Sequence, residues 1–161
     1  MIMLKQIDKL ADKMKWQRRF CAAYRGGLSA WSDKLFDPVA KFYVAVDDGK
    51  ELGYIRMLNC GDDFARYSNE VVESISEGYV KPAYRKNGVL RGMITIAVRD
   101  HNVKLLYIET ERLLQLQSYY SSLGFSTYCG AADDPLMSYA ILNSFDWVIS
   151  AANDDQFQSA A

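Results

Sequence analysis

The sequence predicts a mixed α/β (α+β) fold in which helices flank one mixed sheet, and two patterns carry this prediction. Two strand-like runs enclose Asp48-Gly49, a strong hairpin turn, so these strands are expected to pair antiparallel. A strand over 71–81, an apolar helix over 89–98 and a buried strand over 105–109 then follow in order. Because such a crossover joins parallel neighbours, the sheet is expected to contain a parallel pair.

The N-terminal segment predicts helices. Residues 1–7 fit either a short strand or the start of a helix, and Asp8 is a suitable N-cap. The apolar residues that then recur at roughly helical spacing are Leu10, Met14, Trp16, Phe20 and Tyr24. Gly26-Gly27 is expected to end this helix, and a second short helix is expected over 28–35.

The rest of the chain predicts an alternation of strands and helices within one domain. The expected strands are 41–48, 52–58, 71–81, 105–109, 125–129 and 136–142, and the expected helices are 89–98 and 113–123. Gly78, in the middle of the third strand, predicts a bulge or a close backbone approach. No linker marks a second domain, so 1–149 is expected to be one domain and 150–161 a flexible tail. Residues 144–149 fit an extra strand or a homodimer contact.

The composition excludes several classes of protein. Half of the 161 residues are hydrophobic and 24% are charged, as in an ordinary globular protein. No apolar run is long enough to span a membrane, and the N-terminus does not resemble a signal peptide. Cys21, Cys60 and Cys129 form no Cys-x-x-Cys pair, so neither a zinc site nor a disulfide framework is expected. A cytoplasmic protein is therefore predicted.

The charges are unevenly distributed although the net charge is only −1. Arg112 is the last basic residue, so residues 1–112 carry a surplus of about four positive charges and the remainder carries five acidic residues. This asymmetry favours separate anion-binding and cation-attracting surfaces, the alternative being solvated loop charges. The acidic balance argues against tight binding to nucleic acid.

The segment 79–93 is the most informative stretch, because a basic turn with one glycine, Gly88, joins a strand to an apolar helix. The first N–H groups of a helix have no acceptor within it, and the helix dipole favours negative charge there. The segment therefore predicts a pyrophosphate site of a nucleotide or coenzyme. The alternative is an ordinary strand-to-helix connection.

Two motifs identify a family. The turn reads Arg85-Lys86-Asn87-Gly88-Val89-Leu90, preceded by Val80-x-Pro82-x-Tyr84. The helix predicted at 113–123 ends with the second motif, Tyr120-Ser121-Ser122-Leu123-Gly124-Phe125. With the elements between them in the right order, these motifs resemble the GNAT superfamily of acetyl-coenzyme A-dependent N-acetyltransferases. The resemblance covers residues from about 41 to 142.

This resemblance implies both a fold and a function. The fold would be a GNAT-like central mixed sheet, mostly antiparallel, with a splayed parallel strand pair and about four flanking helices. The function would be transfer of an acetyl group from acetyl-coenzyme A to a primary amine by direct attack in a ternary complex, without a metal. Two residues depart from the family pattern: Leu90 stands where the family prefers Gly or Ala, and Leu113 stands near a frequent Asn.

The resemblance also implies a coenzyme site. The pantetheine arm would lie between strands 71–81 and 105–109, paired with backbone groups of Tyr79 and Lys81 on either side of Val80. The Arg85 side chain would hold the pyrophosphate together with the amides of the turn. These amides belong to Lys86, Asn87, Gly88, Val89 and Leu90. The side chains expected to attract the 3′-phosphate, or else to be solvated, are Lys81, Lys86 and Arg91.

The catalytic groups implied by the resemblance are an acid and a base. Tyr120 would protonate the departing thiolate, and Tyr119 beside it would be the core residue. Glu109, at the end of its strand, and Glu77 or Glu73, on the long strand, are the candidate bases, unless a water chain removes the proton. The two residues expected to be non-catalytic are His101 and Cys129.

Two functions from different classes remain open at this stage. The first is an acetyltransferase acting on a small cationic molecule or a protein amine, drawn by Asp133-Asp134 beside the acceptor site. The second is a catalytically weak or inactive GNAT-like module that binds a protein partner, which the departure at Leu90 favours. A modifier of nucleic-acid bases is disfavoured because the C-terminal third lacks basic residues.

Overall fold

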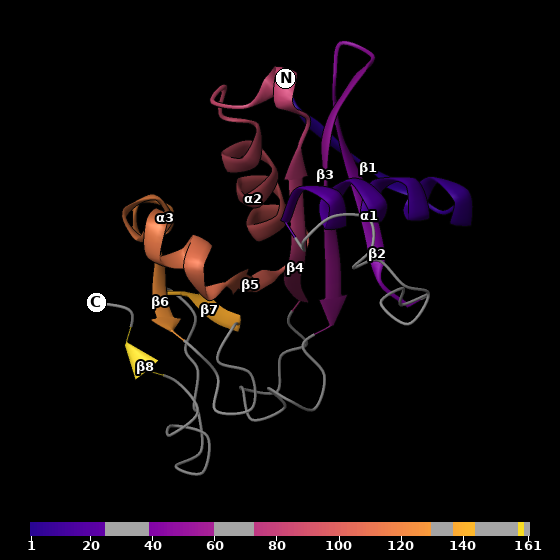
Figure 1. The fold of residues 1–161 in the computed structure, drawn as a ribbon. Coiled ribbons are helices and arrows are strands. Elements are labelled where there is room, and N and C mark those ends of the chain that lie inside the picture. The colour runs from indigo at the N-terminus through magenta and orange to yellow at the C-terminus, as the bar shows by residue number, and fades with distance from the viewer. Residues whose placement is uncertain (25–38, 60–72, 130–136, 144–157, 160–161) are drawn as a thin grey trace. The chain divides into compact units, whose positions relative to one another are not determined.

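The computed structural model describes residues 1–24, 39–59, 73–129, 137–143 and 158–159 (Figure 1). The chain divides into two compact units. The N-terminal unit comprises Met1–Leu58 and Glu77–Ala97, and the C-terminal unit comprises Asn59–Ser76 and Val98–Ala161. The single domain over 1–149 stays a prediction.

The sheet of the N-terminal unit has the strand order β1-β2-β3-β4. Its strands are β1 (Met3–Ile7), β2 (Lys41–Asp47), β3 (Lys50–Asn59) and the second half of β4 (Glu73–Val80). The first seven residues thus contain a strand rather than the start of a helix, and β1 pairs antiparallel with β2. The predicted hairpin between β2 and β3 is confirmed. Both turn residues have positive φ, 48° at Asp48 and 73° at Gly49, as a two-residue type I′ turn requires.

Helix α1 spans Leu10–Tyr24, and the glycines predicted to end it, Gly26-Gly27, lie outside the described residues. The N–H of Lys13 donates to the carbonyl oxygen of Lys9, so Lys9 is the N-cap and Asp8 precedes it. The prediction of Asp8 as the N-cap is therefore wrong by one residue. The side chains that bury the apolar stripe of α1 against the sheet are Trp16, Phe20, Cys21, Phe42, Val44, Tyr54 and Tyr79.

The described residues contain three α-helices rather than about four: α1, α2 (Val89–Asp100) and α3 (Thr110–Ser122). A short 3₁₀ turn, η4 (Pro82–Tyr84), precedes α2. The helix predicted over 28–35 lies outside the described residues. So does the extra strand or dimer contact predicted over 144–149.

Close backbone contact in this sheet occurs at Gly53 rather than at Gly78. A Cβ atom on Gly53 would lie 2.3 Å from the carbonyl oxygen of Tyr79, which is closer than atoms can approach. A Cβ on Gly78 would make only ordinary contact, 3.5 Å from Leu90 Cδ1. The register of β4 against its parallel neighbour shifts between Glu73 and Ser74. The close backbone approach predicted at Gly78 is therefore found at Gly53 instead, and the register irregularity against β5 lies at the start of β4.

We expect Gly53→Ala to destabilise the protein by about 2–3 kcal/mol, since neither backbone can move away without breaking the β3–β4 ladder. Gly92→Ala is the matched control, because its Cβ would meet only the flexible Ile2 Cδ1, at 3.1 Å. In α2, alanine gains roughly 1 kcal/mol of helix propensity over glycine. Urea denaturation of the two variants measures both effects, and equal stabilities would contradict the close approach.

The C-terminal unit contains the predicted parallel pair. Glu73, Ser74 and Ile75 of β4 pair parallel with Val103, Leu105 and Leu106 of β5 (Val103–Glu109). Strand β7 (Met137–Leu142) pairs antiparallel with both β5 and β6 (Phe125–Cys129). Among the described strands the sheet is thus mostly antiparallel, as expected. Strand β8 (Gln158–Ser159), within the segment predicted to be a tail, pairs antiparallel with the end of β6.

Candidate active site

The basic turn presents backbone N–H groups at the start of α2. Lys86 and Gly88 have positive φ, 63° and 76°, so the chain turns sharply between η4 and the helix. The carbonyl oxygen of Gly88 accepts from the N–H of Gly92 at 2.9 Å, which makes Gly88 the N-cap of α2. The N–H groups of the first turn therefore have no acceptor within the helix. The first turn also has no acidic side chain, so the positive end of the helix dipole is not neutralised there.

Gly88 leaves open space in front of these groups. A Cβ added to it would meet nothing within 4 Å. Lys86 and Asn87 are exposed as well. An anion can therefore approach the turn, and the arrangement has the geometry by which helix N-termini bind phosphate.

The Arg85 side chain folds back over the end of β4. Its Nε donates to the carbonyl oxygen of Val80 at 2.9 Å, and its guanidinium carbon lies 5.5 Å from the centre of the Tyr79 ring. These contacts hold the guanidinium next to the turn and use only its Nε donor. The Nη groups of an arginine are further donors suited to phosphate oxygens.

Leu90 points toward the sheet. Its Cδ1 lies 3.5 Å from the place where a Cβ of Gly78 would stand, so the leucine occupies the space left by a strand residue without a side chain. Leu90 is half-buried in this contact. The departure from the family pattern is therefore compensated within the N-terminal unit, because the large residue on α2 faces a glycine on β4.

We expect Leu90→Gly to cost stability rather than coenzyme affinity. The variant loses the contact with Gly78 and roughly 1 kcal/mol of helix propensity, so the total loss should be about 2 kcal/mol. Coenzyme affinity should change by less than about threefold, since the side chain is turned away from the first-turn amides. Leu90→Ala retains the helix propensity, so its stability should lie between those of the wild-type protein and Leu90→Gly. A folded Leu90→Gly protein that had lost coenzyme binding would show that the leucine contacts the coenzyme.

The backbone of β4 divides its hydrogen-bonding groups between two edges. The N–H of Lys81 donates to the carbonyl oxygen of Leu52 on β3 at 2.9 Å. Because the groups of successive residues alternate between the edges of a strand, those of Tyr79 face β3 too, and those of Gly78 and Val80 face the opposite edge. The N–H of Lys81 is therefore already used by β3 and is not a free donor for the predicted pairing of a pantetheine arm with Tyr79 and Lys81.

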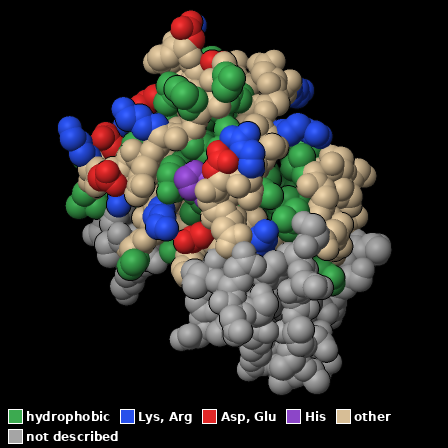
Figure 2. Space-filling model, turned by 180° about the vertical axis from the view of Figure 1, so that it is seen from behind, with side chains coloured by type: hydrophobic (Ala, Val, Ile, Leu, Met, Phe, Trp, Pro, Cys, Tyr) green, Lys and Arg blue, Asp and Glu red, His purple; other side chains and the backbone are tan. Residues whose placement is uncertain are grey.

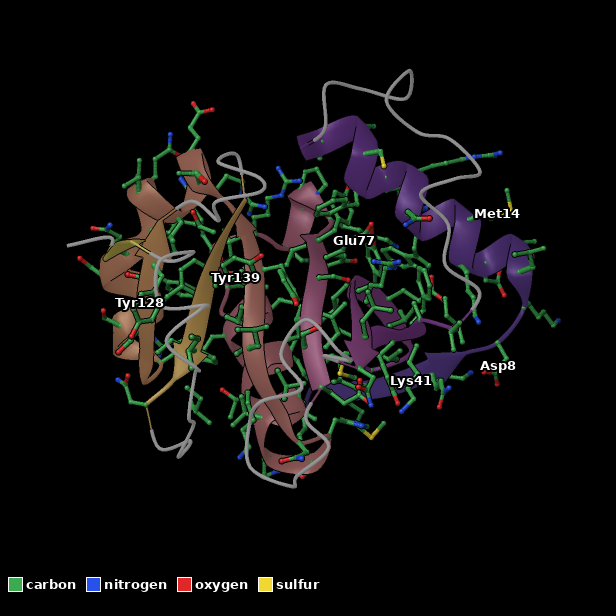
Figure 3. The ribbon with its side chains drawn as sticks, turned by 90° about the horizontal axis from the view of Figure 1, so that it is seen from below. Asp8, Met14, Lys41, Glu77, Tyr128 and Tyr139 are labelled. Atoms are coloured by element: carbon green, nitrogen blue, oxygen red, sulfur yellow. The ribbon has the colours of Figure 1, made fainter. Side chains whose placement is uncertain are left out.

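Glu77 is buried beneath α1 with only 5% of its surface exposed (Figure 3). One carboxylate oxygen accepts from Nε2 of Gln17 at 2.9 Å, and the other accepts from the hydroxyl of Tyr54 at 2.8 Å. Burial raises the pKa of Tyr54 well above its ordinary value, and the negative charge of Glu77 and their hydrogen bond raise it further. The tyrosine thus stays a donor, and the carboxylate is held in one orientation.

The C-terminal unit carries the other candidate catalytic groups. Tyr120 on α3 is 4% exposed, whereas Tyr119 is half-buried, the reverse of the predicted division between site and core. The two rings meet edge to face with their centres 5.3 Å apart. Glu109 is the last residue of β5 and directly precedes α3.

Other predicted positions fall elsewhere. Leu113 is fully buried, which explains an apolar residue at this position of α3. Glu73 lies at the start of β4, where its N–H donates to the carbonyl oxygen of Asn102. His101 follows the end of α2, and Cys129 ends β6. The acidic loop at 133–134 lies outside the described residues.

Several other features of the described residues bear on function. On the face seen in Figure 2, Lys and Arg side chains are interspersed with Asp and Glu. Within 1–24, 39–59, 73–129, 137–143 and 158–159, no group of three or more His, Cys, Asp or Glu side chains could hold a metal ion. A pocket of about 810 Å³ in the C-terminal unit is lined by hydroxyl and amide side chains of α3 and β6, and none of the predicted site residues lines it. None of the described helices has the length and apolar character to span a membrane.

Comparison with known families identifies the class of protein to which this fold and this turn belong. A family model described as an acetyltransferase (GNAT) domain matches residues 38–127, more than half of the chain. The chain therefore belongs to the GNAT acetyltransferase family. A search of curated proteins gave no match.

Solved structures share the fold at low sequence identity. A Bacillus subtilis acetyltransferase in complex with CoA superposes with a TM-score of 0.60 at 12% identity, covering 88% of this chain and 98% of that one. An IAA acetyltransferase from Bacillus cereus gives 0.59 at 13% identity, with coverage of 88% and 99%. The yncA protein of Salmonella typhimurium, with its cofactor acetyl-CoA, gives 0.54 at 14% identity, with coverage of 94% and 99%.

The sequence did not reveal every residue that shapes the site. Gln17 and Tyr54, the donors to Glu77, come from α1 and β3. Nothing in their local sequence signals this role, because a Gln in an amphipathic helix and a Tyr in a strand are ordinary residues. Gly53 carried a weak signal, since a glycine inside a strand often marks close backbone approach.

Proposed function

We propose that this protein transfers an acetyl group from acetyl-coenzyme A to a primary amine. The observation that carries the proposal is the turn at 85–90, in which Lys86 and Gly88 have positive φ and Gly88 is the N-cap of α2. The N–H groups of the first helical turn are open there, and that turn contains no acidic side chain. In the proposal the pyrophosphate binds these amides and the Arg85 side chain. The pantetheine arm pairs with Gly78 and Val80 on the edge of β4 opposite β3.

The chemistry needs a base for the amine and an acid for the thiolate. In the proposed reaction the amine nitrogen attacks the thioester carbonyl carbon, a C–N bond forms, and the C–S bond breaks. The nitrogen loses a proton to a base, and the sulfur gains one from the Tyr120 hydroxyl. Glu77 is the preferred base over Glu109, because its carboxylate is already oriented by Gln17 and Tyr54. Its oxygens have about four lone-pair sites, so these donors leave room for another.

The competing proposal was an inactive module that binds a protein partner, and it depended on Leu90. Since Leu90 packs toward Gly78, its bulk does not narrow the turn. This contact favours an active enzyme over the inactive module.

Titration calorimetry with acetyl-coenzyme A tests the proposal directly. We expect saturable binding at a single site, and competition by coenzyme A. Release of free thiol in the presence of a panel of primary amines then measures the transfer. A folded protein that did not bind the coenzyme would refute the proposed function, and one that bound it without turnover of any amine would support the inactive module.

A further inference from the structure

Two cations from different elements lie close to the ring of one buried tryptophan. The guanidinium carbon of Arg19 lies 4.5 Å from the centre of the Trp16 ring, and the ammonium nitrogen of Lys81 lies 5.5 Å from the same centre. Trp16 is 1% exposed, so each cation contacts a ring that is fixed within the core. Arg19 belongs to α1, whereas Lys81 follows the end of β4.

These two cations form no ion pair within the described part of the chain. Neither Arg19 nor Lys81 forms an ion pair with an acidic side chain there. Nη1 of Arg19 is buried and, among the described residues, has no hydrogen-bond acceptor. Because a buried charged donor without an acceptor is unfavourable, and two like charges repel each other, an anion bound here would relieve both costs.

The pair lies on the face of β4 that contacts α1, as does the Arg85 guanidinium, whose carbon is 5.5 Å from the centre of the Tyr79 ring. Side chains alternate along a strand, so Glu77, Tyr79 and Lys81 share one face. That face contacts α1, through Gln17 to Glu77 and through Trp16 to Tyr79, whose ring centres are 6.4 Å apart. Gly78 faces Leu90 of α2 instead. The Lys81 side chain therefore belongs with Arg19 rather than with the amides of α2.

A carboxylate lies on this face as well. The Trp16 ring is 5.6 Å from the Tyr54 ring, whose hydroxyl donates to Glu77. The same aromatic cluster thus carries a fixed negative charge and two positive charges that have no acidic partner in the described residues. A ligand that matches it carries a positive amine and a negative group together.

We propose that Arg19 and Lys81 form a subsite for a carboxylate of the acceptor, so that the substrate class is amines that bear an acid group, such as α-amino acids. The inference rests on the proposed function, with Glu77 on the amine side. It replaces the expectation of a purely cationic acceptor, and it moves Lys81 from the coenzyme to the acceptor.

The test compares matched acceptors that differ only in the carboxylate. The pairs are phenylalanine and phenethylamine, leucine and isoamylamine, and lysine and cadaverine, and the readout is thiol release. For at least one pair, kcat/KM of the wild-type protein should be about 10- to 100-fold higher for the amino acid, the range of a charge-assisted hydrogen bond. Arg19→Gln should reduce this ratio to near 1, and Arg19→Lys should retain part of it. A preference for the carboxylate-free amines would overturn the proposal, as would a ratio that Arg19→Gln left unchanged.

Lys13→Gln is the matched control. Lys13 also belongs to α1 and lies over an aromatic ring, with its ammonium 5.7 Å from the centre of Phe42, so its loss should leave the ratio unchanged. Calorimetry tests whether the anion bound by these cations is instead a phosphate of the coenzyme. If Arg19→Gln weakened coenzyme A binding tenfold or more, the pair would serve the coenzyme's phosphates, and the proposal would be wrong.

A second measurement does not require turnover. N-acetylphenylalanine and N-acetylleucine, the products of such a reaction, should raise the melting temperature of the wild-type protein, and their C-terminal amides should not. Arg19→Gln should abolish the difference. If neither acid stabilised the protein more than its amide, the subsite would be refuted even where coenzyme binding was normal, so this failure differs from failure of the proposed function.

Discussion

Tyr120→Phe should lower the rate of acetyl transfer by about 10²- to 10⁴-fold, the usual contribution of a general acid, while coenzyme affinity stays nearly unchanged. The reason is that phenylalanine keeps the buried ring and removes only the proton donor needed when the thiolate leaves. Single-turnover rates are the measurement, because slow product release would hide part of the loss.

Tyr119→Phe is the control for this prediction. Its ring contacts that of Tyr120 at 5.3 Å between centres, so the variant changes the same neighbourhood without removing the proposed acid. It should retain a wild-type rate. Wild-type single-turnover rates in Tyr120→Phe would leave Tyr120 as a packing residue of α3.

A second large effect is expected at the turn before α2, the proposed pyrophosphate site, where Gly88→Glu should weaken coenzyme binding by at least about 100-fold, or about 2.7 kcal/mol. Glutamate places bulk and negative charge in the open space in front of the first-turn amides of α2. The charge also neutralises the favourable end of the helix dipole. Calorimetric titration with acetyl-coenzyme A measures the loss.

Gly49→Glu controls for backbone strain. Gly49 has φ of 73°, against 76° at Gly88, and a Cβ at either position meets nothing within 4 Å. The two variants should therefore lose similar stability, of order 1 kcal/mol, from a left-handed conformation that side chains disfavour. Only Gly88→Glu should lose the coenzyme. Normal affinity in a folded Gly88→Glu protein would remove the turn from the site.

Local patterns were sufficient to predict several elements correctly. The hairpin at Asp48-Gly49 depends on two residues that tolerate positive φ, and the start of α2 after Gly88 depends on a glycine turn before an apolar run. The crossover from β4 through α2 to β5 required a parallel pair, whatever the partners on either side. These features follow from short stretches of chain, because turn geometry and helix termini are decided within a few residues.

Other features depended on residues that are distant in the sequence. Leu90 fits the turn because it contacts Gly78 on β4, and the N–H of Lys81 is occupied because it donates to Leu52 on β3. The orientation of Glu77 likewise depends on Gln17 and Tyr54. Periodicity predicts which face of an element is apolar, but not which side chain of another element meets it.

The sequence by itself therefore determined the class of the protein, the order of most of its elements and the position of the basic turn before α2. Each of these is a local property of backbone conformation and residue spacing. Only the tertiary structure decided which elements contact the two faces of β4. One face turns Gly78 to α2, and the other brings Glu77 and Lys81 to the Gln17, Trp16 and Arg19 side chains of α1. The physical reason is that burial and charge pairing depend on which elements pack together, and packing joins residues some sixty positions apart.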